Sequence, residues 1–179
     1  MFRLLIFTLY MAMGFSQDGG VGEKSSPLNI PASFAGTYGE LRSGRFHAGL
    51  DFRVGGVVGE PIYSIDDGYI SRVTVSSTGY GNGLYITHPD GTTSIYGHMH
   101  NFSPEIARLV KERQYETESL NVNIVLDSDV FPVQRGDYIG NVGNSGSSAA
   151  PHLHFEVRQP DGSGPVNVIS AGYFEHRDD

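Results

Sequence analysis

The stretch that decides the fold is HLHFEVR, residues 152–158. Side chains two positions apart in an extended chain lie on the same face, about 6.5–7 Å from each other. A β-strand here would place His152, His154 and Glu156 on one face and the apolar residues between them on the other. Two imidazoles above a buried sheet indicate either an ordinary exposed strand face or a functional site, and the rest of the chain has to decide between them.

The composition favours one β-rich domain. The chain has 179 residues, enough for a single core, and its 24 glycines and 9 prolines point to many turns. Short apolar alternations separated by turn signals run along most of its length. One helix interrupts them, with Ser103 as its N-cap, Pro104 in its first turn, and an end near Thr117. We therefore predict a mostly β fold, a single β-sheet domain with one short inserted helix.

Two further segments carry histidines on strands. Alternation over residues 46–54 predicts a single strand with His47 and Asp51 on its polar face. Residues 83–100 predict a hairpin that turns at 89–91. On its return strand, His98 has the same phase as Tyr96, and we expect both on the face opposite the apolar residues. Three strands would thus each present histidine away from the core.

The residue types available point to a metal site built without thiolates. The chain has no cysteine, so any bound metal must be held by histidine, aspartate or glutamate. Catalytic zinc sites in proteins use three such ligands and keep a fourth position for water, which the metal activates. Spacing alone does not say which of His152 and His154 would bind a metal, nor that the three segments are neighbours in space.

Three ordered motifs resemble a known family. HAGLD (47–51), YGHMH (96–100) and HLHFEV (152–157) are similar to motifs of the lysostaphin-type zinc endopeptidases, which cleave peptide cross-bridges in bacterial peptidoglycan. The segment PVQRGDYIGNVGNSG (132–146) matches as well. The resemblance covers residues 28–168, and three motifs in order make it specific. It implies a mostly β fold, an antiparallel β-sheet single domain with a groove active site, which agrees with the strands predicted above.

The resemblance implies a role for each of the five residues. The metal ligands of the family fall on His47, Asp51 and His154, which would hold one zinc ion. Its two catalytic imidazoles fall on His98 and His152. Glu156 shares their face and could orient an imidazole, but it is not among the predicted site residues. His88 is expected to be structural and His100 exposed. The segment 101–131 is longer than in compact members of the family, and we expect it to form a wall of the substrate groove.

The N-terminal sequence predicts export. Residues 1–16 combine Arg3 with an apolar run and small residues before Gln17, as in a signal peptide. The apolar run is too short for a membrane span, which needs about 20 residues. A buried N-terminal helix is the weaker alternative, because the run has no polar face. We divide the chain into a signal peptide (1–16), a flexible leader (17–27), the zinc metallopeptidase domain (28–168) and a C-terminal tail (169–179).

These observations favour an exported enzyme, periplasmic or extracellular, that acts on peptide stems and cross-bridges of peptidoglycan. The net charge of −8 makes the chain a poor binder of nucleic acid. The alternatives are a non-catalytic relative that binds cell wall or activates an amidase, and a metal-binding scaffold without turnover. Of the two bonds cut within the family, we expect the D-alanyl–diaminopimelate link in a periplasm rather than an oligoglycine bridge.

Overall fold

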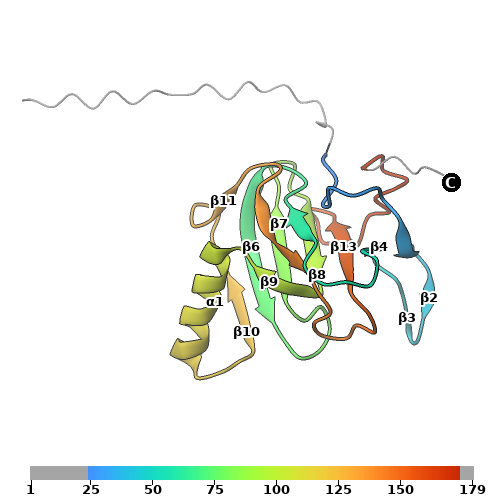
Figure 1. The fold of residues 1–179 in the computed structure, drawn as a ribbon. Coiled ribbons are helices and arrows are strands. Elements are labelled where there is room, and N and C mark those ends of the chain that lie inside the picture. The colour runs from blue at the N-terminus through green and yellow to red at the C-terminus, as the bar shows by residue number, and fades with distance from the viewer. Residues whose placement is uncertain (1–23, 174–179) are drawn as a thin grey trace, which may run out of the picture.

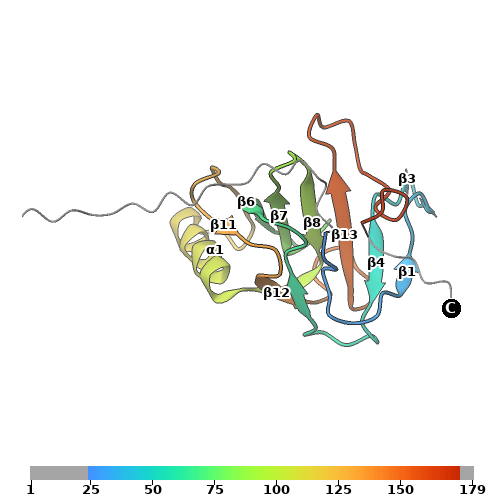
Figure 2. The ribbon, with the colours of Figure 1, turned by 90° about the horizontal axis from the view of Figure 1, so that it is seen from above.

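The computed structural model describes residues 24–173 as a mostly β fold, which confirms the predicted class. The largest sheet has eight strands in the order β1-β4-β13-β8-β7-β6-β10, with β11 paired to β6 (Figures 1 and 2). Every pair of neighbours is antiparallel. The strands are β1 (Phe34–Gly36), β4 (Leu50–Arg53), β6 (Gly68–Val75), β7 (Gly83–Thr87), β8 (Thr93–Gly97), β10 (Val122–Val125), β11 (Pro132–Val133) and β13 (His152–Arg158).

Two smaller sheets complete the β structure. A three-stranded sheet pairs β12 (Tyr138–Val142) with both β5 (Pro61–Tyr63) and β9 (Met99–Phe102). A two-stranded hairpin is formed by β2 (Leu41–Arg42) and β3 (Arg45–Phe46). Apolar side chains of the eight-stranded and three-stranded sheets join in one buried cluster, which includes Leu50, Ile62, Met99, Ile139 and Phe155. The two larger sheets therefore share a core.

The helix α1 (Pro104–Thr117) begins and ends where the sequence predicts. Ser103 precedes it with an extended backbone, and Pro104 occupies its first turn, where the missing N–H costs no hydrogen bond. Ile106 and Val110 bury its apolar stripe. In Figure 2, α1 lies beside the β6–β11 end of the large sheet, whereas β4 and β1 form the other end.

The register of three neighbouring strands sets the two faces of the sheet. His154 of β13 lies opposite Asp51 of β4 and Gly97 of β8. Directly opposed residues in antiparallel strands point to the same side, so Asp51 and His154 share one face. The next residue along, Phe155, is fully buried on the other face. The alternation predicted for 152–158 is confirmed.

The strand predicted over 46–54 is interrupted. β3 ends at Phe46, which is 69% exposed rather than in the core, and β4 begins only at Leu50. Gly49 accounts for the break, because the chain crosses β13 so closely that a Cβ there would lie 2.2 Å from the Phe155 carbonyl oxygen. The interruption turns His47 inward, and its side chain is buried.

The predicted phase of the 93–100 strand is also wrong. Tyr96 is fully buried in the core, where its hydroxyl accepts a hydrogen bond from the Ile65 amide. A regular strand would have carried His98 to that same core face. Instead β8 ends at Gly97, and His98 has a φ of 59°, in the left-handed region. This turn re-aims the His98 side chain to the opposite face before β9 begins in the other sheet.

The ends of the domain differ in one respect from the sequence analysis. Residues 24–27, assigned to a flexible leader, lie against the domain: Lys24 is buried and forms ion pairs of 3.1 Å with Asp66 and 2.9 Å with Asp90. The Ser25 amide donates to the Ile65 carbonyl. The predicted signal peptide, 1–16, and residues 17–23 lie outside the described residues, as do 174–179.

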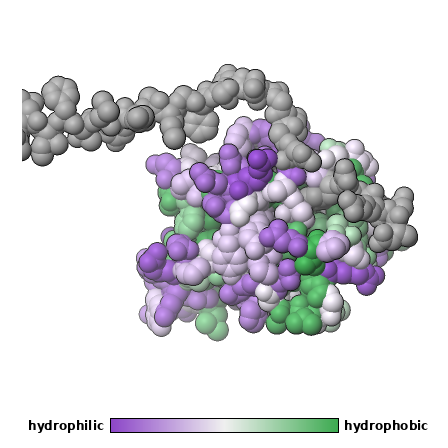
Figure 3. All heavy atoms as spheres, turned by 45° about the horizontal axis from the view of Figure 1, so that its top comes forward, coloured by the Kyte–Doolittle hydropathy of each residue, from purple (hydrophilic) through white to green (hydrophobic). Residues whose placement is uncertain are grey.

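The surface is mixed in character. Figure 3 shows a face with many hydrophilic residues and smaller hydrophobic patches between them. Within residues 24–173, no helix is both long and apolar enough to cross a bilayer.

Candidate metal centre

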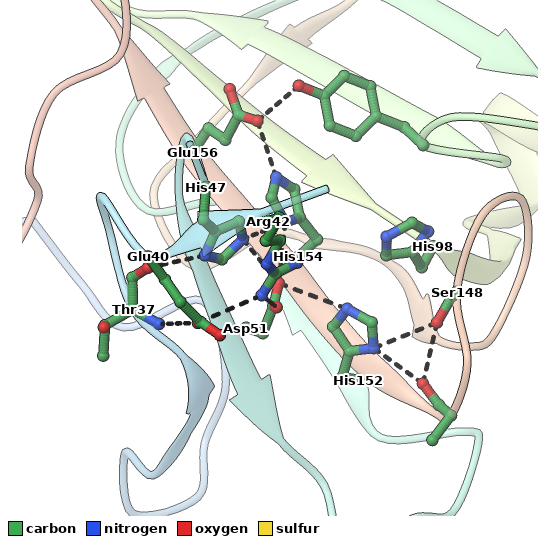
Figure 4. A network of polar contacts seen from close by, with 12 residues as sticks. Thr37, Glu40, Arg42, His47, Asp51, His98, Ser148, His152, His154 and Glu156 are labelled. Carbon is green, nitrogen blue, oxygen red and sulfur yellow. Dashed lines mark hydrogen bonds and ion pairs between the residues drawn. The ribbon is translucent and has the colours of Figure 1, made fainter. Parts of the chain in front are cut away.

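Three side chains from two neighbouring strands and the turn before them meet on the polar face of the sheet. His47 Nε2 lies 3.0 Å from His154 Nδ1 and 3.1 Å from Asp51 Oδ1, and the Asp51 oxygen is 2.9 Å from His154 Nδ1. All three residues are buried, and their ligand atoms could hold a metal ion. The structure therefore brings together the three residues that the sequence analysis assigns to the metal (Figure 4).

Outer hydrogen bonds fix which nitrogen of each imidazole faces the centre. His47 Nδ1 lies 2.9 Å from the Thr37 carbonyl oxygen, which can only accept, so Nδ1 carries the proton. His154 Nε2 lies 2.8 Å from a carboxylate oxygen of Glu156 and is protonated for the same reason. With a metal at the centre, His47 Nε2 and His154 Nδ1 are then the nitrogens that offer it lone pairs. Such outer acceptors are typical of metal-binding histidines. Without a metal, burial lowers the pKa of His154, but the hydrogen bonds to Asp51 and Glu156 raise it overall, because both carboxylates accept from this ring.

The donor set fits a divalent cation. Two nitrogen lone pairs and a carboxylate oxygen, each about 3 Å from the others, would repel one another without positive charge between them. A tetrahedral ion with ligand distances of about 2.0–2.1 Å has its ligand atoms about 3.3 Å apart. The observed triangle is close to this size. Two imidazoles and one carboxylate are among the ligand types that zinc uses in proteins.

Asp51 is held ionised with one oxygen available. Burial alone would raise the pKa of its carboxyl group, but the neighbouring histidines and Arg42 hold that pKa far below its usual range. Arg42 Nη2 donates to Oδ2 at 2.5 Å, so that Oδ1 is the oxygen facing His47 and His154. The Arg42 contact thus orients Asp51 so that a single oxygen, Oδ1, faces the two imidazoles.

His152 presents a lone-pair nitrogen beside this centre. Its Nδ1 donates to the Ala150 carbonyl oxygen at 2.8 Å, with Ser148 Oγ at 3.2 Å. Its Nε2 lies 3.4 Å from Asp51 Oδ1 but outside hydrogen-bonding geometry, and it is buried with no hydrogen-bond partner among residues 24–173. An unsatisfied buried nitrogen aimed at a metal-site-like cluster marks a place for a ligand or a reacting proton.

His98 stands on the other side of His152, with ring centroids 4.8 Å apart. Its Nδ1 donates to the Ser145 carbonyl oxygen at 2.8 Å. Burial, together with the neighbouring His152 and His154, lowers the pKa of His98 to about 4, although the Ser145 carbonyl acts in the opposite direction. His98 is therefore neutral at pH 7, and its Nε2 is a lone-pair nitrogen like that of His152.

The sequence analysis did not predict the hydrogen bonds that Glu156 forms beside the centre. Its carboxylate accepts from His154 Nε2, from the Tyr80 hydroxyl at 2.5 Å and from Arg158 Nε at 2.7 Å. Burial raises the pKa of Glu156, but these partners lower it overall to about 2. The sequence did indicate that Glu156 and Arg158 lie on the same face of one strand. It gave no indication that Tyr80 would join them, since Tyr80 lies in the loop before β7.

A cavity of about 770 Å³ opens over the cluster. Its walls come from the β2–β3 hairpin, the 53–56 turn, Tyr80 and the loop 147–151. No described residue of 101–131 lines it, so the expectation that this segment walls the groove is wrong. The segment carries α1, which packs at the far end of the sheet (Figure 2). Of the other histidines, His100 is exposed and His88 is buried between Asp67 and Ser94, as the sequence analysis expects.

Comparison with known families assigns the chain to one of them. The model of Peptidase family M23 matches residues 45–121 and 112–168, which include all five clustered side chains. The chain belongs to peptidase family M23. The resemblance drawn from the three sequence motifs is thereby confirmed.

Individual M23 relatives are similar over most of the chain. DD-carboxypeptidase/endopeptidase Mpg of Neisseria meningitidis serogroup B (strain ATCC BAA-335 / MC58) is 32% identical over 73% of this chain and 24% of its own length. Glycyl-glycine endopeptidase ALE-1 of Staphylococcus capitis is 30% identical over 64% of this chain and 25% of its own. The chain therefore spans about a quarter of the length of these curated relatives.

Solved M23 catalytic domains have a similar fold. A catalytic-domain mutant of the prophage-encoded M23 protein EnpA from Enterococcus faecalis matches with a TM-score of 0.54 and 28% identity, covering 76% of this chain and 88% of the other. The catalytic domain of the antimicrobial peptidase lysostaphin from Staphylococcus simulans matches with a TM-score of 0.57 and 25% identity, covering 78% and 91%.

Proposed function

We propose that this chain is a zinc-dependent endopeptidase that hydrolyses peptide cross-links of bacterial peptidoglycan. The observation that carries the proposal is the triangle of His47 Nε2, Asp51 Oδ1 and His154 Nδ1, with the unpartnered Nε2 of His152 beside it. Membership of a peptidase family supports the reaction class, as do two relatives whose names describe a DD-carboxypeptidase/endopeptidase, Mpg, and a glycyl-glycine endopeptidase, ALE-1.

In this proposal His47, Asp51 and His154 hold one zinc ion. Zinc bound there supplies a Lewis acid that lowers the pKa of a water molecule and polarises the scissile carbonyl. Thr37 and Glu156 keep the two imidazoles in the tautomers that present lone pairs to the centre. Arg42 keeps Asp51 from turning its second oxygen inward. Three protein ligands leave the fourth position for water and substrate.

His152 and His98 move the protons. His152 accepts the proton of the attacking water at Nε2, since its Nδ1 proton is held by the Ala150 carbonyl. His98, whose Nε2 carries no proton at pH 7, takes the water proton over from the neighbouring His152, stabilises the developing oxyanion while it is charged, and delivers the proton to the leaving amine. A pKa of about 4 favours this role, because a protonated His98 gives its proton up readily.

The remaining features of the proposal concern place and substrate. We infer an exported protein, periplasmic or extracellular, with residues 1–16 as its signal peptide and 28–168 as its catalytic domain. Its partners are peptide stems and cross-bridges, with no nucleic acid. The D-alanyl–diaminopimelate link remains our expected bond. Non-catalytic relatives of such enzymes lack metal ligands, whereas this chain keeps a full set, which favours catalysis over the wall-binding or amidase-activating alternative.

The test combines metal analysis with turnover. Purified protein should contain about one zinc per chain and release peptides from cross-linked muropeptides. His152→Ala should abolish release while it retains zinc, and Asp51→Ala should lose both. His100→Ala, at an exposed histidine of the same motif, is the matched control and should behave as wild type. Full activity in both the His152 and Asp51 variants would overturn the proposal.

A further inference from the structure

Positive charge is concentrated around the cavity of an acidic protein. The whole chain has 12 lysines and arginines against 20 aspartates and glutamates. The cavity wall reverses this balance, with four arginines (Arg42, Arg45, Arg53 and Arg158) and two carboxylates (Asp51 and Glu156). A divalent metal would add to the excess. Clefts lined by one sign of charge attract ligands of the other sign, and an acidic protein needs such a cleft to bind an anion.

Two of the four arginines are already paired. Arg42 bonds Asp51 at 2.5 Å and lies 3.6 Å from Glu40. Arg158 bonds Glu156 with two nitrogens, at 2.5 and 2.7 Å. These pairs neutralise both carboxylates of the wall. The positive charge that no carboxylate of the wall neutralises therefore lies on the other two arginines.

Arg45 and Arg53 have no carboxylate partner within residues 24–173, and both are exposed. Arg53 is nevertheless fixed in direction, because its Nε donates to the Phe34 carbonyl oxygen at 2.9 Å. This contact leaves the two terminal nitrogens, the fork that binds a carboxylate through parallel hydrogen bonds. An exposed guanidinium held by its inner nitrogen is pre-organised for an anion.

The register of the sheet places Arg53 beside the reacting groups. Arg53 of β4 is directly opposite His152 of β13, two residues along from the Asp51–His154 pair. Opposed residues project from the same face, so the Arg53 side chain leaves the sheet next to the imidazole with the unpartnered nitrogen. Arg45 reaches the cavity from the β2–β3 hairpin, where it is opposite Arg42.

We propose that Arg53, assisted by Arg45, binds a free carboxylate of the peptide substrate close to the scissile amide. The cavity then selects anionic stem peptides over uncharged peptides such as oligoglycine. A link to diaminopimelate meets this requirement, because the carbon that bears the acylated nitrogen also bears a carboxylate. This inference rests on the proposed endopeptidase function and specifies its substrate.

The experiment uses two peptides that share one scissile amide. In one, the carbon attached to the leaving nitrogen carries a free carboxylate; in the other, that group is a carboxamide. The measured quantity is the ratio of kcat/KM for the two peptides, which does not depend on the fraction of active protein. We expect wild type to favour the carboxylate by about three- to tenfold. Arg53→Gln together with Arg45→Gln should bring the ratio close to one.

Three comparisons separate binding from structure. Arg53→Lys keeps the charge but not the fork and should fall between wild type and Arg53→Gln. Arg108→Gln removes an exposed arginine of α1 far from the cavity and should keep the wild-type ratio. Arg53→Gln could also weaken the domain through the lost Phe34 contact, but a purely structural role would lower both rates and leave their ratio unchanged.

A binding measurement tests the inference without turnover. Calorimetry uses zinc-loaded His152→Ala protein, which should keep the metal without cleaving the peptides, and compares the two Kd values with Arg45 and Arg53 intact and with both changed to Gln. A carboxylate preference that survives unchanged without the two arginines belongs to the metal and overturns the inference, as does an equal Kd for the two peptides when both arginines are present. If calorimetry shows the arginine-dependent preference but wild type cleaves neither peptide, the proposed function fails while the carboxylate site stands.

Discussion

The carboxylate of Glu156 accepts a hydrogen bond of 2.8 Å from His154 Nε2, while Nδ1 of the same ring faces Asp51 at 2.9 Å. One imidazole therefore joins an outer carboxylate to an inner one. The outer carboxylate fixes the ring orientation and makes Nδ1 a better electron donor. Glu156 is held in turn by Tyr80 and Arg158.

Glu156→Gln should weaken zinc binding by about 10- to 100-fold, because a neutral amide polarises the imidazole less and leaves Arg158 without its counter-charge. Competition with a chromogenic chelator measures the zinc Kd directly. Glu112→Gln, on the exposed face of α1, is the control and should bind zinc as wild type does. An unchanged zinc Kd in Glu156→Gln would show that Glu156 does not contribute to zinc binding.

Removing the metal should destabilise the domain. The three donor atoms of His47, Asp51 and His154 lie together only in the folded protein, so an ion that binds them stabilises the folded state. Free zinc at 100 times its Kd should contribute about 2.7 kcal/mol, seen as a higher Tm. Asp51→Asn should lose most of this zinc-induced shift. The idea fails if zinc raises the Tm of Asp51→Asn as much as that of wild type.

Gly49 should tolerate no larger residue. A Cβ there would lie 2.2 Å from the Phe155 carbonyl oxygen, so Gly49→Ala must move β13 away from the turn that carries His47. We expect a loss of about 1–3 kcal/mol in the free energy of unfolding, together with weaker zinc binding. Gly136→Ala is a useful contrast: its φ of +85° strains an alanine, but its Cβ meets nothing within 4 Å. Urea unfolding should show a cost there without any change in zinc Kd.

His88 should make the stability depend on pH. Burial lowers its pKa below 6.5, although the hydrogen bond to the Asp67 carbonyl acts the other way. The unfolded chain then binds more protons than the folded protein just below pH 6.5, so the free energy of unfolding falls as the pH decreases through this range. His98 contributes in the same direction.

His88→Gln should flatten this pH dependence in metal-free protein, measured as urea midpoints between pH 7.5 and 5. The exposed His100→Gln serves as the control and should keep the wild-type slope. Equal slopes in wild type and His88→Gln would show that the buried imidazole is not the titrating group.

Local periodicity predicted the part of the site that lies within a regular strand. Residues 152–158 alternate as a strand must, so the sequence alone was enough to assign His154 and Glu156 to one face. The helix at 104–117 was predictable for the same reason, because its capping and spacing signals are local. The family motifs then named the five residues that the fold collects.

Breaks in regular structure could not be read from alternation. The turn at Gly49 and the left-handed backbone of His98 each interrupt a strand, and both interruptions aim a histidine at the centre. Continuing the strand period across them put Phe46 in the core and Tyr96 on the site face, the reverse of their positions. Local sequence patterns do not show which strands are neighbours in a sheet. The sequence therefore could not predict that α1 lies far from the cavity.

The two neighbours Asp51 and His154 are 103 positions apart in the chain. A nascent polypeptide that has emerged as far as β12 holds only the first two donors, and its large sheet has a gap between β4 and β8. Pairing of β13 on both of its sides closes that gap and completes the triangle of donor atoms in one event. On the proposed function, a folding chain could not bind its metal, and so could not hydrolyse a peptide, before β13 has taken this place.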